Sequence, residues 1–389
     1  MGSAAPLSGP VVIRRTRLLS TGWAASSDSA VDVVDVELKD GRIADIRPAA
    51  GSAGPAEAEV MDGSDWSLAP GLIDLQVNGG WGHDLTADPE AVWDVGAGLL
   101  RHGVTAWLPT LVSAPVEVRH RALSVLADGP PPGWIGAEPL GWHFEGPYLN
   151  PDRRGAHRFD AIEPVPANLA ELPLPRLMTI APELDGALDA VADLVERGVV
   201  VSIGHTNASA ETVGAALAAG ATMGTHLFNA MSGIHHREPG ATVGLLDSNA
   251  WLGLIADGHH VAPEVMRLAW NLAGDRLVLV SDAMAGLGQA DGPTTLGSRL
   301  AVIGGGAVRL EGGTLAGSVL PLDRAVLQFA QAVGVSLADA VPLATLHPAR
   351  ALGLAGAGRL TIGGQADLAA FDSTGAITAT FITGRPVTV

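Results

Sequence analysis

Residues 199–229, VVVSIGHTNASAETVGAALAAGATMGTHLFN, show most clearly the pattern that predicts the fold. A short β-branched run ends in Gly204-His205, an Ala-rich helical stretch follows, and a second short run ends in Thr225-His226. Short apolar strands that alternate with helical stretches are typical of repeated βα units. The segment therefore predicts two consecutive βα units, each with a histidine directly after its strand.

The same alternation extends from Gly71 to about Ala351. The expected strands begin at eight positions, Leu72, Val104, Leu140, Leu177, Val199, Thr222, Leu252 and Leu277. Eight βα units predict an α/β fold, a (β/α)8 TIM-type barrel whose active site lies at the C-terminal ends of the strands. A doubly wound open sheet is the competing arrangement.

The two ends of the chain have a different character. Residues 34–38 and 42–46 are short alternating apolar runs separated by Gly, Asp and Pro, and residues 364–389 are similar. This pattern predicts strands joined by tight turns. We expect a small β-sandwich domain built from residues 1–69 and 356–389, around a catalytic barrel at residues 70–355.

Composition excludes several classes of protein. The 389 residues carry a net charge of −18, which disfavours nucleic acid and anionic lipid as partners, and no apolar run reaches the ~18 residues of a membrane span. A small anionic substrate stays compatible, because local cations dominate within a Debye length of about 8–10 Å. With no cysteine, any metal must be held by histidine and carboxylate. The N-terminus does not resemble a signal peptide, so a cytoplasmic enzyme is expected.

Ionisable residues follow four of the expected strands, namely Glu145, His205, His226 and Asp282. The two histidines are 226 − 205 = 21 residues apart, about one short βα repeat, which places their imidazoles side by side at the barrel mouth. Two imidazoles and the Glu145 carboxylate form a set that leaves a metal position open, as in catalytic divalent sites. Taken singly, each residue could instead be a hydrogen-bonded histidine or an ion-paired scaffold carboxylate.

Several motifs resemble one known family. They are PGLID (70–74), HFEGPY (143–148), GAH (155–157), IGHT (203–206), THLFNAM (225–231), REPG (237–240), VSDA (280–283) and GGQADL (363–368). Together they resemble N-acetylglucosamine-6-phosphate deacetylases of the amidohydrolase superfamily, and they cover nearly the whole chain. The first motif alone indicates only the superfamily, whereas HFEGP, HLFNAM and REPG are much more specific.

The resemblance implies hydrolysis of the acetamide of N-acetyl-D-glucosamine 6-phosphate to D-glucosamine 6-phosphate and acetate, in amino-sugar catabolism and cell-wall sugar recycling. It implies one divalent ion per chain, expected to be Zn²⁺, held by Glu145, His205 and His226 and activating a water. Asp282 would be the general base and then the general acid.

One motif departs from the wider superfamily. Many amidohydrolases carry His-x-His after strand one, whereas this chain has Gln76 and Asn78, and amides are poor zinc ligands. We therefore expect Gln76 and Asn78 to orient a ligand or water, while a second metal position stays open as the alternative.

The resemblance also implies a set of substrate contacts, Ala156, His157, Asn229, Ala230, Arg237, His260, Leu315, Ala316 and Gly317. The phosphate would meet Arg237 and His260, with Arg237 reaching the site of a neighbouring subunit in a functional homodimer. The alternatives are a surface ion pair for Arg237 and a loop cap for His157.

Two rival functions remain distinguishable by sequence. A dihydroorotase-like or allantoinase-like enzyme bridges two metals with a modified lysine, but the single lysine of this chain, Lys39, lies in the N-terminal sheet region. A catalytically silent barrel would be expected to lose its metal ligands or Asp282, and this chain keeps them.

Overall fold

Eight parallel strands form a nearly closed barrel in the computed structural model, which describes residues 9–19, 33–49, 57–168, 170, 173–296 and 299–387. In order around the barrel they are β6 (Leu72–Val77), β9 (Val104–Val112), β11 (His143–Glu145), β12 (Leu177–Ile180), β13 (Val200–Ile203), β14 (Met223–Gly224), β15 (Trp251–Leu254) and β16 (Leu277–Leu279). The segment after β16 closes the barrel against β6. There the N–H of Asp282 donates to the carbonyl of Gln76 at 2.9 Å. The predicted barrel is confirmed, and the open sheet is wrong.

Seven of the eight strands begin within one residue of the predicted position. The third begins at His143 rather than Leu140, because a short strand β10 (Glu138–Pro139) first pairs with β9. Gly141 then adopts a φ of +120°, which a residue with a side chain rarely adopts. This turn separates β10 from β11.

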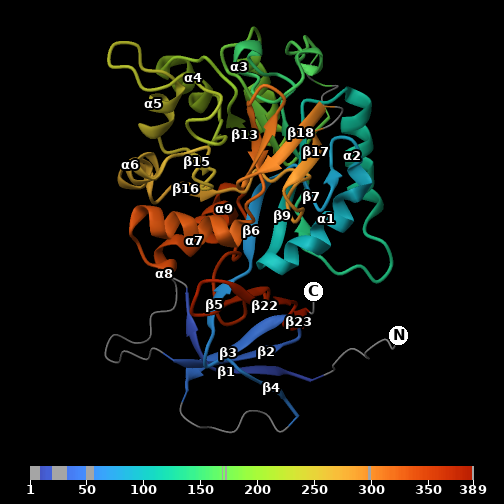
Figure 1. The fold of residues 1–389 in the computed structure, drawn as a ribbon, viewed down its shortest axis with the longest axis vertical. Helices are drawn as coiled ribbons and strands as arrows, with labels where there is room; N and C mark the ends of the chain where they lie inside the picture. The colour runs from blue at the N-terminus through green and yellow to red at the C-terminus, as the bar shows by residue number, and fades with distance from the viewer. Residues whose placement is uncertain are drawn as a thin grey trace.

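Helices follow most barrel strands and cover the outside of the barrel (Figure 1). They are α1 (Val92–Leu99), α2 (Val116–Asp128), α3 (Ala187–Glu196), α4 (Ala210–Ala218), α5 (Ala241–Leu246), α6 (Pro263–Ala273) and α7 (Leu322–Val333), followed by α8 (Leu337–Ala340) and α9 (Leu346–Ala351). Amphipathic α7 buries Leu322, Val326 and Phe329. Between β11 and β12 the described residues include the short 3₁₀ turns η3 (Pro151–Arg153) and η4 (Phe159–Ala161).

Within the described ranges no single helix is long and apolar enough to cross a bilayer. Only the segments Leu322–Val333 and Leu337–Ala351, taken together across a bend of 118°, reach the required length and hydropathy.

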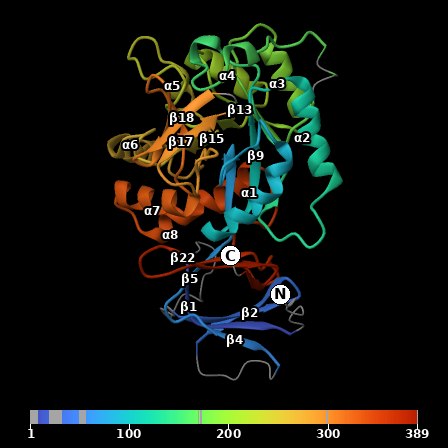
Figure 2. The same cartoon turned by 45° about the vertical axis from the view of Figure 1, so that its right-hand side comes forward.

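Strands from both ends of the chain form a separate β-sheet domain below the barrel (Figures 1 and 2). These strands are β1 (Val11–Leu18), β2 (Val34–Lys39), β3 (Arg42–Pro48), β4 (Glu59–Asp62), β5 (Ser67–Pro70), β21 (Leu368–Phe371), β22 (Ile377–Ile382) and β23 (Arg385–Val387). The two termini meet where β5 pairs with β21, around a core that includes Ile13, Leu38 and Phe381. The boundaries at residues 69/70 and 355/356 stay a prediction.

Because β6 begins two residues after β5 ends, the starts of the parallel strands face the sheet domain. Their C-terminal ends, which carry the ionisable residues, point away from it.

A small antiparallel sheet between β16 and α7 was not predicted. It consists of β17 (Gly292–Leu296), β18 (Arg299–Gly304), β19 (Ala307–Leu310) and β20 (Leu315–Ser318). A bridge between Ala283 and Ser318 joins β20 to the end of the eighth barrel strand. The inserted sheet therefore brings residues 315–317 to the barrel mouth.

Candidate metal centre and active site

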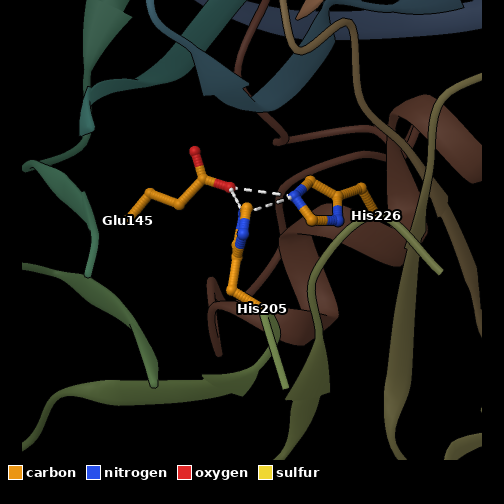
Figure 3. Close-up of side chains that lie close together, drawn as sticks. All are labelled: Glu145, His205 and His226. Carbon is orange, nitrogen blue, oxygen red and sulfur yellow. Dashed lines mark hydrogen bonds and ion pairs between the residues drawn. The ribbon is translucent and has the colours of Figure 1, made fainter. Parts of the chain in front are cut away.

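Glu145, His205 and His226 converge at the C-terminal end of the barrel (Figure 3). The Nε2 atoms of both histidines lie 2.9 Å from Glu145 Oε1 and 3.1 Å from each other. All three side chains are buried, with residue exposures of 3–4%. We call this set the metal group.

The chemistry of the metal group fits a divalent ion. His205 Nδ1–H donates to the Arg153 carbonyl at 2.8 Å, which leaves Nε2 as the ring nitrogen that faces the centre. Ligands of a tetrahedral zinc with bonds of about 2.0–2.1 Å stand roughly 3.3 Å apart, close to the spacing seen here. The three atoms are therefore already arranged as one face of such a site.

Electrostatics within the metal group favour an ionised carboxylate. Burial acts to raise the pKa of Glu145, but hydrogen bonds from His205 and His226 outweigh it and hold that pKa well below its usual range. Burial acts to lower the pKa of His226, and the adjacent Glu145 carboxylate reverses this, so that its pKa is raised. Positive charge is therefore favoured beside Glu145. Either a proton on His226 or a bound metal ion supplies that charge.

The backbone is strained where it presents these side chains. His205, His226 and Asp282 have φ values of 49°, 28° and 49°, in the left-handed region that residues with a side chain seldom adopt. Such strain collects at functional sites, where the surrounding structure enforces it.

Asp282 is held by the two amides of strand one. Its Oδ1 accepts hydrogen bonds from Asn78 Nδ2 at 2.7 Å and Gln76 Nε2 at 3.1 Å. Burial, together with the nearby Glu145 charge, raises the pKa of Asp282 to about 6. Gln76 and Asn78 thus face the carboxylate of Asp282 with their N–H groups, an arrangement that suits an orienting role.

His157 is fixed in one tautomer by Ser113. The Ser113 backbone N–H donates to His157 Nδ1 at 3.1 Å, and the Ser113 hydroxyl lies 2.8 Å from the same atom. Burial and the neighbouring His205 lower the pKa of His157 to about 3, so the ring is neutral with its proton on Nε2. This Nε2 lies 3.8 Å from Glu145 Oε2, beside the metal group.

A cavity of about 320 Å³ opens above the metal group. It brings together most of the predicted site residues, namely Asn78, Glu145, Ala156, His157, His205, His226, Asn229, Ala230, His260, Asp282, Leu315, Ala316 and Gly317. Gln76 lies behind Asp282 and does not line it.

Arg237 does not reach this cavity. Its side chain is exposed and donates to His236 Nε2 at 2.9 Å. The cavity of a single chain therefore lacks the predicted arginine.

Two residues that orient predicted site histidines were given no role by sequence reasoning. Asp257 accepts from His260 Nδ1 at 2.6 Å and orients that ring, and its position at a strand end next to His260 was an available signal. Ser113 carried no signal, because only the tertiary fold brings it to His157, 44 residues away.

Residues 67–387 match the family model described as "Amidohydrolase family". An N-acetylgalactosamine-6-phosphate deacetylase of Escherichia coli O157:H7 is 40% identical over 93% of this chain and 95% of its own. An N-acetylglucosamine-6-phosphate deacetylase of Bos taurus is 39% identical over 91% of each chain.

A solved structure gives the same result. A mutant N-acetyl-D-glucosamine-6-phosphate deacetylase from Mycobacterium smegmatis, in complex with N-acetyl-D-glucosamine 6-phosphate, superposes with a TM-score of 0.87 at 33% identity and covers 98% of this chain and 100% of its own. The chain therefore belongs to the amidohydrolase family, among the N-acetylglucosamine-6-phosphate deacetylases, as its motifs implied.

Proposed function

We propose that this protein hydrolyses the acetamide of N-acetyl-D-glucosamine 6-phosphate to D-glucosamine 6-phosphate and acetate. The observation that carries the proposal is the buried metal group beside Asp282 in one cavity. The proposed substrate is the one that the names of the similar proteins give. The cavity of about 320 Å³ has the size of a small-molecule site.

A divalent ion held by Glu145, His205 and His226 would polarise the amide carbonyl and lower the pKa of a water. Asp282 would take the proton of that water and pass it to the amine, which leaves only once protonated. Since Gln76 and Asn78 occupy Oδ1 of Asp282, Oδ2 is the atom available to carry the proton.

Neutral His157 would donate its Nε2–H to the acetyl carbonyl oxygen. This donor is pre-oriented by Ser113, so it needs no reorganisation when negative charge develops on that oxygen. The proposal thus gives His157 a substrate contact in place of a loop cap.

The sugar phosphate would extend toward His260, Asn229 and Ala230, with residues 315–317 along one edge of the ring. Gly317 has a φ of +104°, and a Cβ there would stand 2.5 Å from Met284 Cγ, so only glycine fits this edge.

Acetate release tests the proposed function. The purified, metal-loaded protein should release acetate from N-acetylglucosamine 6-phosphate, and the 4-epimer should be assayed beside it because one relative is named for that substrate. Activity on neither sugar phosphate, in a protein shown to hold its ion, would contradict the proposal.

The proposal includes three finer points. Zinc is the proposed ion, supported by the two histidines and one carboxylate of the metal group. A homodimer with a shared Arg237 is proposed because that side chain is exposed and absent from its own chain's cavity. A cytoplasmic location is proposed because a charged sugar phosphate does not cross a bilayer unaided.

Replacement of Arg237 should test the phosphate contact. A charge-assisted hydrogen bond is worth roughly 1.5–3 kcal/mol, so Arg237→Ala should lower kcat/KM for the 6-phosphate about ten- to a hundredfold. Turnover of unphosphorylated N-acetylglucosamine should barely change, and steady-state kinetics on both sugars measures the difference. An equal loss on both would mean that Arg237 does not meet the phosphate.

Mixed dimers test whether Arg237 is shared. Combining Arg237→Ala and Asp282→Asn subunits should restore some activity if Arg237 acts across the interface, because one hybrid site then holds both native residues. Verified mixed dimers without recovery would contradict the sharing and leave the deacetylase proposal in place.

A further inference from the structure

A buried chain of hydrogen bonds crosses the inside of the barrel next to the metal group. His143 Nε2 lies 2.8 Å from Thr179 Oγ1, Thr179 Oγ1 lies 2.7 Å from Thr225 Oγ1, and Thr225 Oγ1 lies 2.6 Å from Ser202 Oγ. Each of these residues is at most 4% exposed. We call the four residues the hydroxyl chain.

The hydroxyl chain separates the apolar barrel interior from the metal group. Thr179 follows buried Leu177 by two positions and Thr225 follows buried Met223 by two, so each pair shares one face of its strand. His143 precedes Glu145 by two positions on β11 and shares its face in the same way. The polar layer is therefore adjacent to the ligands along the strands.

Thr179 occupies the centre of this layer. It belongs to β12, which supplies no side chain to the metal group but lies between the strand of Glu145 and the strand that precedes His205. Its Cα pairs with that of Glu145 on one side and that of Ser202 on the other. Thr179 thus pairs through its backbone with β11 and β13, and its hydroxyl contacts His143 on β11 and Thr225 next to His226.

The direction of the hydrogen bonds leaves no spare donor. Thr110 Oγ1 donates to the Leu108 carbonyl at 3.2 Å, so toward His143 Nδ1, 3.3 Å away, it can only accept. With its proton on Nδ1, the neutral His143 ring accepts at Nε2 from the Thr179 hydroxyl. Thr179 then accepts from Thr225. The loss of the central hydroxyl would leave two buried partners unsatisfied.

Packing connects this layer directly to His205. A Cβ added to Gly204 would lie 2.8 Å from Thr225 Cβ and 2.9 Å from Thr179 Cγ2. The backbone that precedes His205 therefore rests against both threonines without room for a side chain. A shift of either threonine would displace the strained turn that presents His205.

We propose that Thr179 is a positioning residue of the metal centre, whose hydroxyl holds the strands of Glu145, His205 and His226 at the separation that the ion requires. The inference rests on the metal site of the proposed function. It assigns a role to β12, a strand that neither binds the ion nor carries the proton.

The test compares two substitutions of the same residue. Thr179→Val keeps the shape and removes the hydroxyl, whereas Thr179→Ser keeps the hydroxyl and removes the methyl. Competition between Zn²⁺-loaded protein and a chelator should show Zn²⁺ affinity at least about tenfold weaker in Thr179→Val, the loss typical of groups that orient metal ligands. Thr179→Ser should stay within about threefold of the native protein.

The visible absorption spectrum of the Co²⁺-loaded protein gives a second readout, independent of activity. It should change in Thr179→Val and not in Thr179→Ser, because the band positions report the ligand geometry. Native affinity and spectrum in Thr179→Val, even with a lower melting temperature, would overturn the inference. Equal losses in both variants would also overturn it, because a variant that keeps the hydroxyl would then bind no better than one that lacks it.

A milder variant covers the case in which Thr179→Val does not fold. Ser202→Ala removes only the terminal donor of the hydroxyl chain, and Zn²⁺ affinity should fall about tenfold, the low end of the loss expected when an orienting partner is removed. Unchanged affinity there would overturn the inference. Native protein that binds no Zn²⁺ would overturn the proposed metal site itself, which distinguishes the two failures.

Discussion

Asp282→Asn should lower kcat by about 10²–10⁴ while the protein keeps its fold and its metal. The amide retains an Oδ1 that can still accept from Gln76 and Asn78, so the side chain should stay in place. It cannot take a proton from water and return it to the amine. Steady-state kinetics on metal-replete protein measures the effect.

A matched control separates this loss from the general removal of a buried carboxylate. Asp35 is also buried, but it accepts the Arg15 backbone N–H in the terminal sheet domain, far from the cavity. Asp35→Asn should leave kcat unchanged. Near-normal turnover in metal-replete Asp282→Asn would rule out the proton-transfer role.

Glu145→Ala should abolish metal binding and activity together. The native protein should hold close to one tight divalent ion per chain, and the variant very little, because two imidazoles without the carboxylate lack the anionic ligand of the set. Activity should fall at least about 10³-fold, since a metal supplies several kcal/mol of transition-state stabilisation and each 1.36 kcal/mol is a factor of ten. Elemental analysis and acetate release measure the two effects.

Glu138 offers the control for this prediction, because it is an exposed glutamate on β10. Glu138→Ala should keep both the ion and the activity. Two ions retained equally tightly by the native protein after mild chelation would show instead that Gln76 and Asn78 help to hold a second metal. Full metal content in Glu145→Ala would remove Glu145 from the ligand set.

The fold and the metal group were accessible from sequence for a common physical reason. Parallel strands of a barrel end at one rim, so residues placed at the same offset from their strand ends converge in space. Glu145 ends its strand, His205 and His226 follow theirs by two residues and Asp282 by three, and the structure places all four around one cavity. The pattern tolerated strand positions that were wrong by up to three residues, as for the strand of Glu145.

The inserted sheet β17–β20 could not be predicted from the local pattern of apolar and polar residues. Its strands are only four to six residues long, so each presents few alternating apolar residues to a sequence pattern. The resemblance alone pointed to residues 315–317, whereas the structure shows how the sheet delivers them to the cavity.

The barrel strands, the residues at their ends and the family could all be predicted from the sequence. Which atoms meet depends on the folded chain: Gln76 and Asn78 donate to Asp282 across more than 200 residues, Ser113 sets the tautomer of His157, and Thr179 stands at the centre of the hydroxyl chain. The physical reason is one of scale. Periodicity specifies the face of an element, but a hydrogen bond requires donor and acceptor within about 3 Å and in line, which depends on how all the strands pack together.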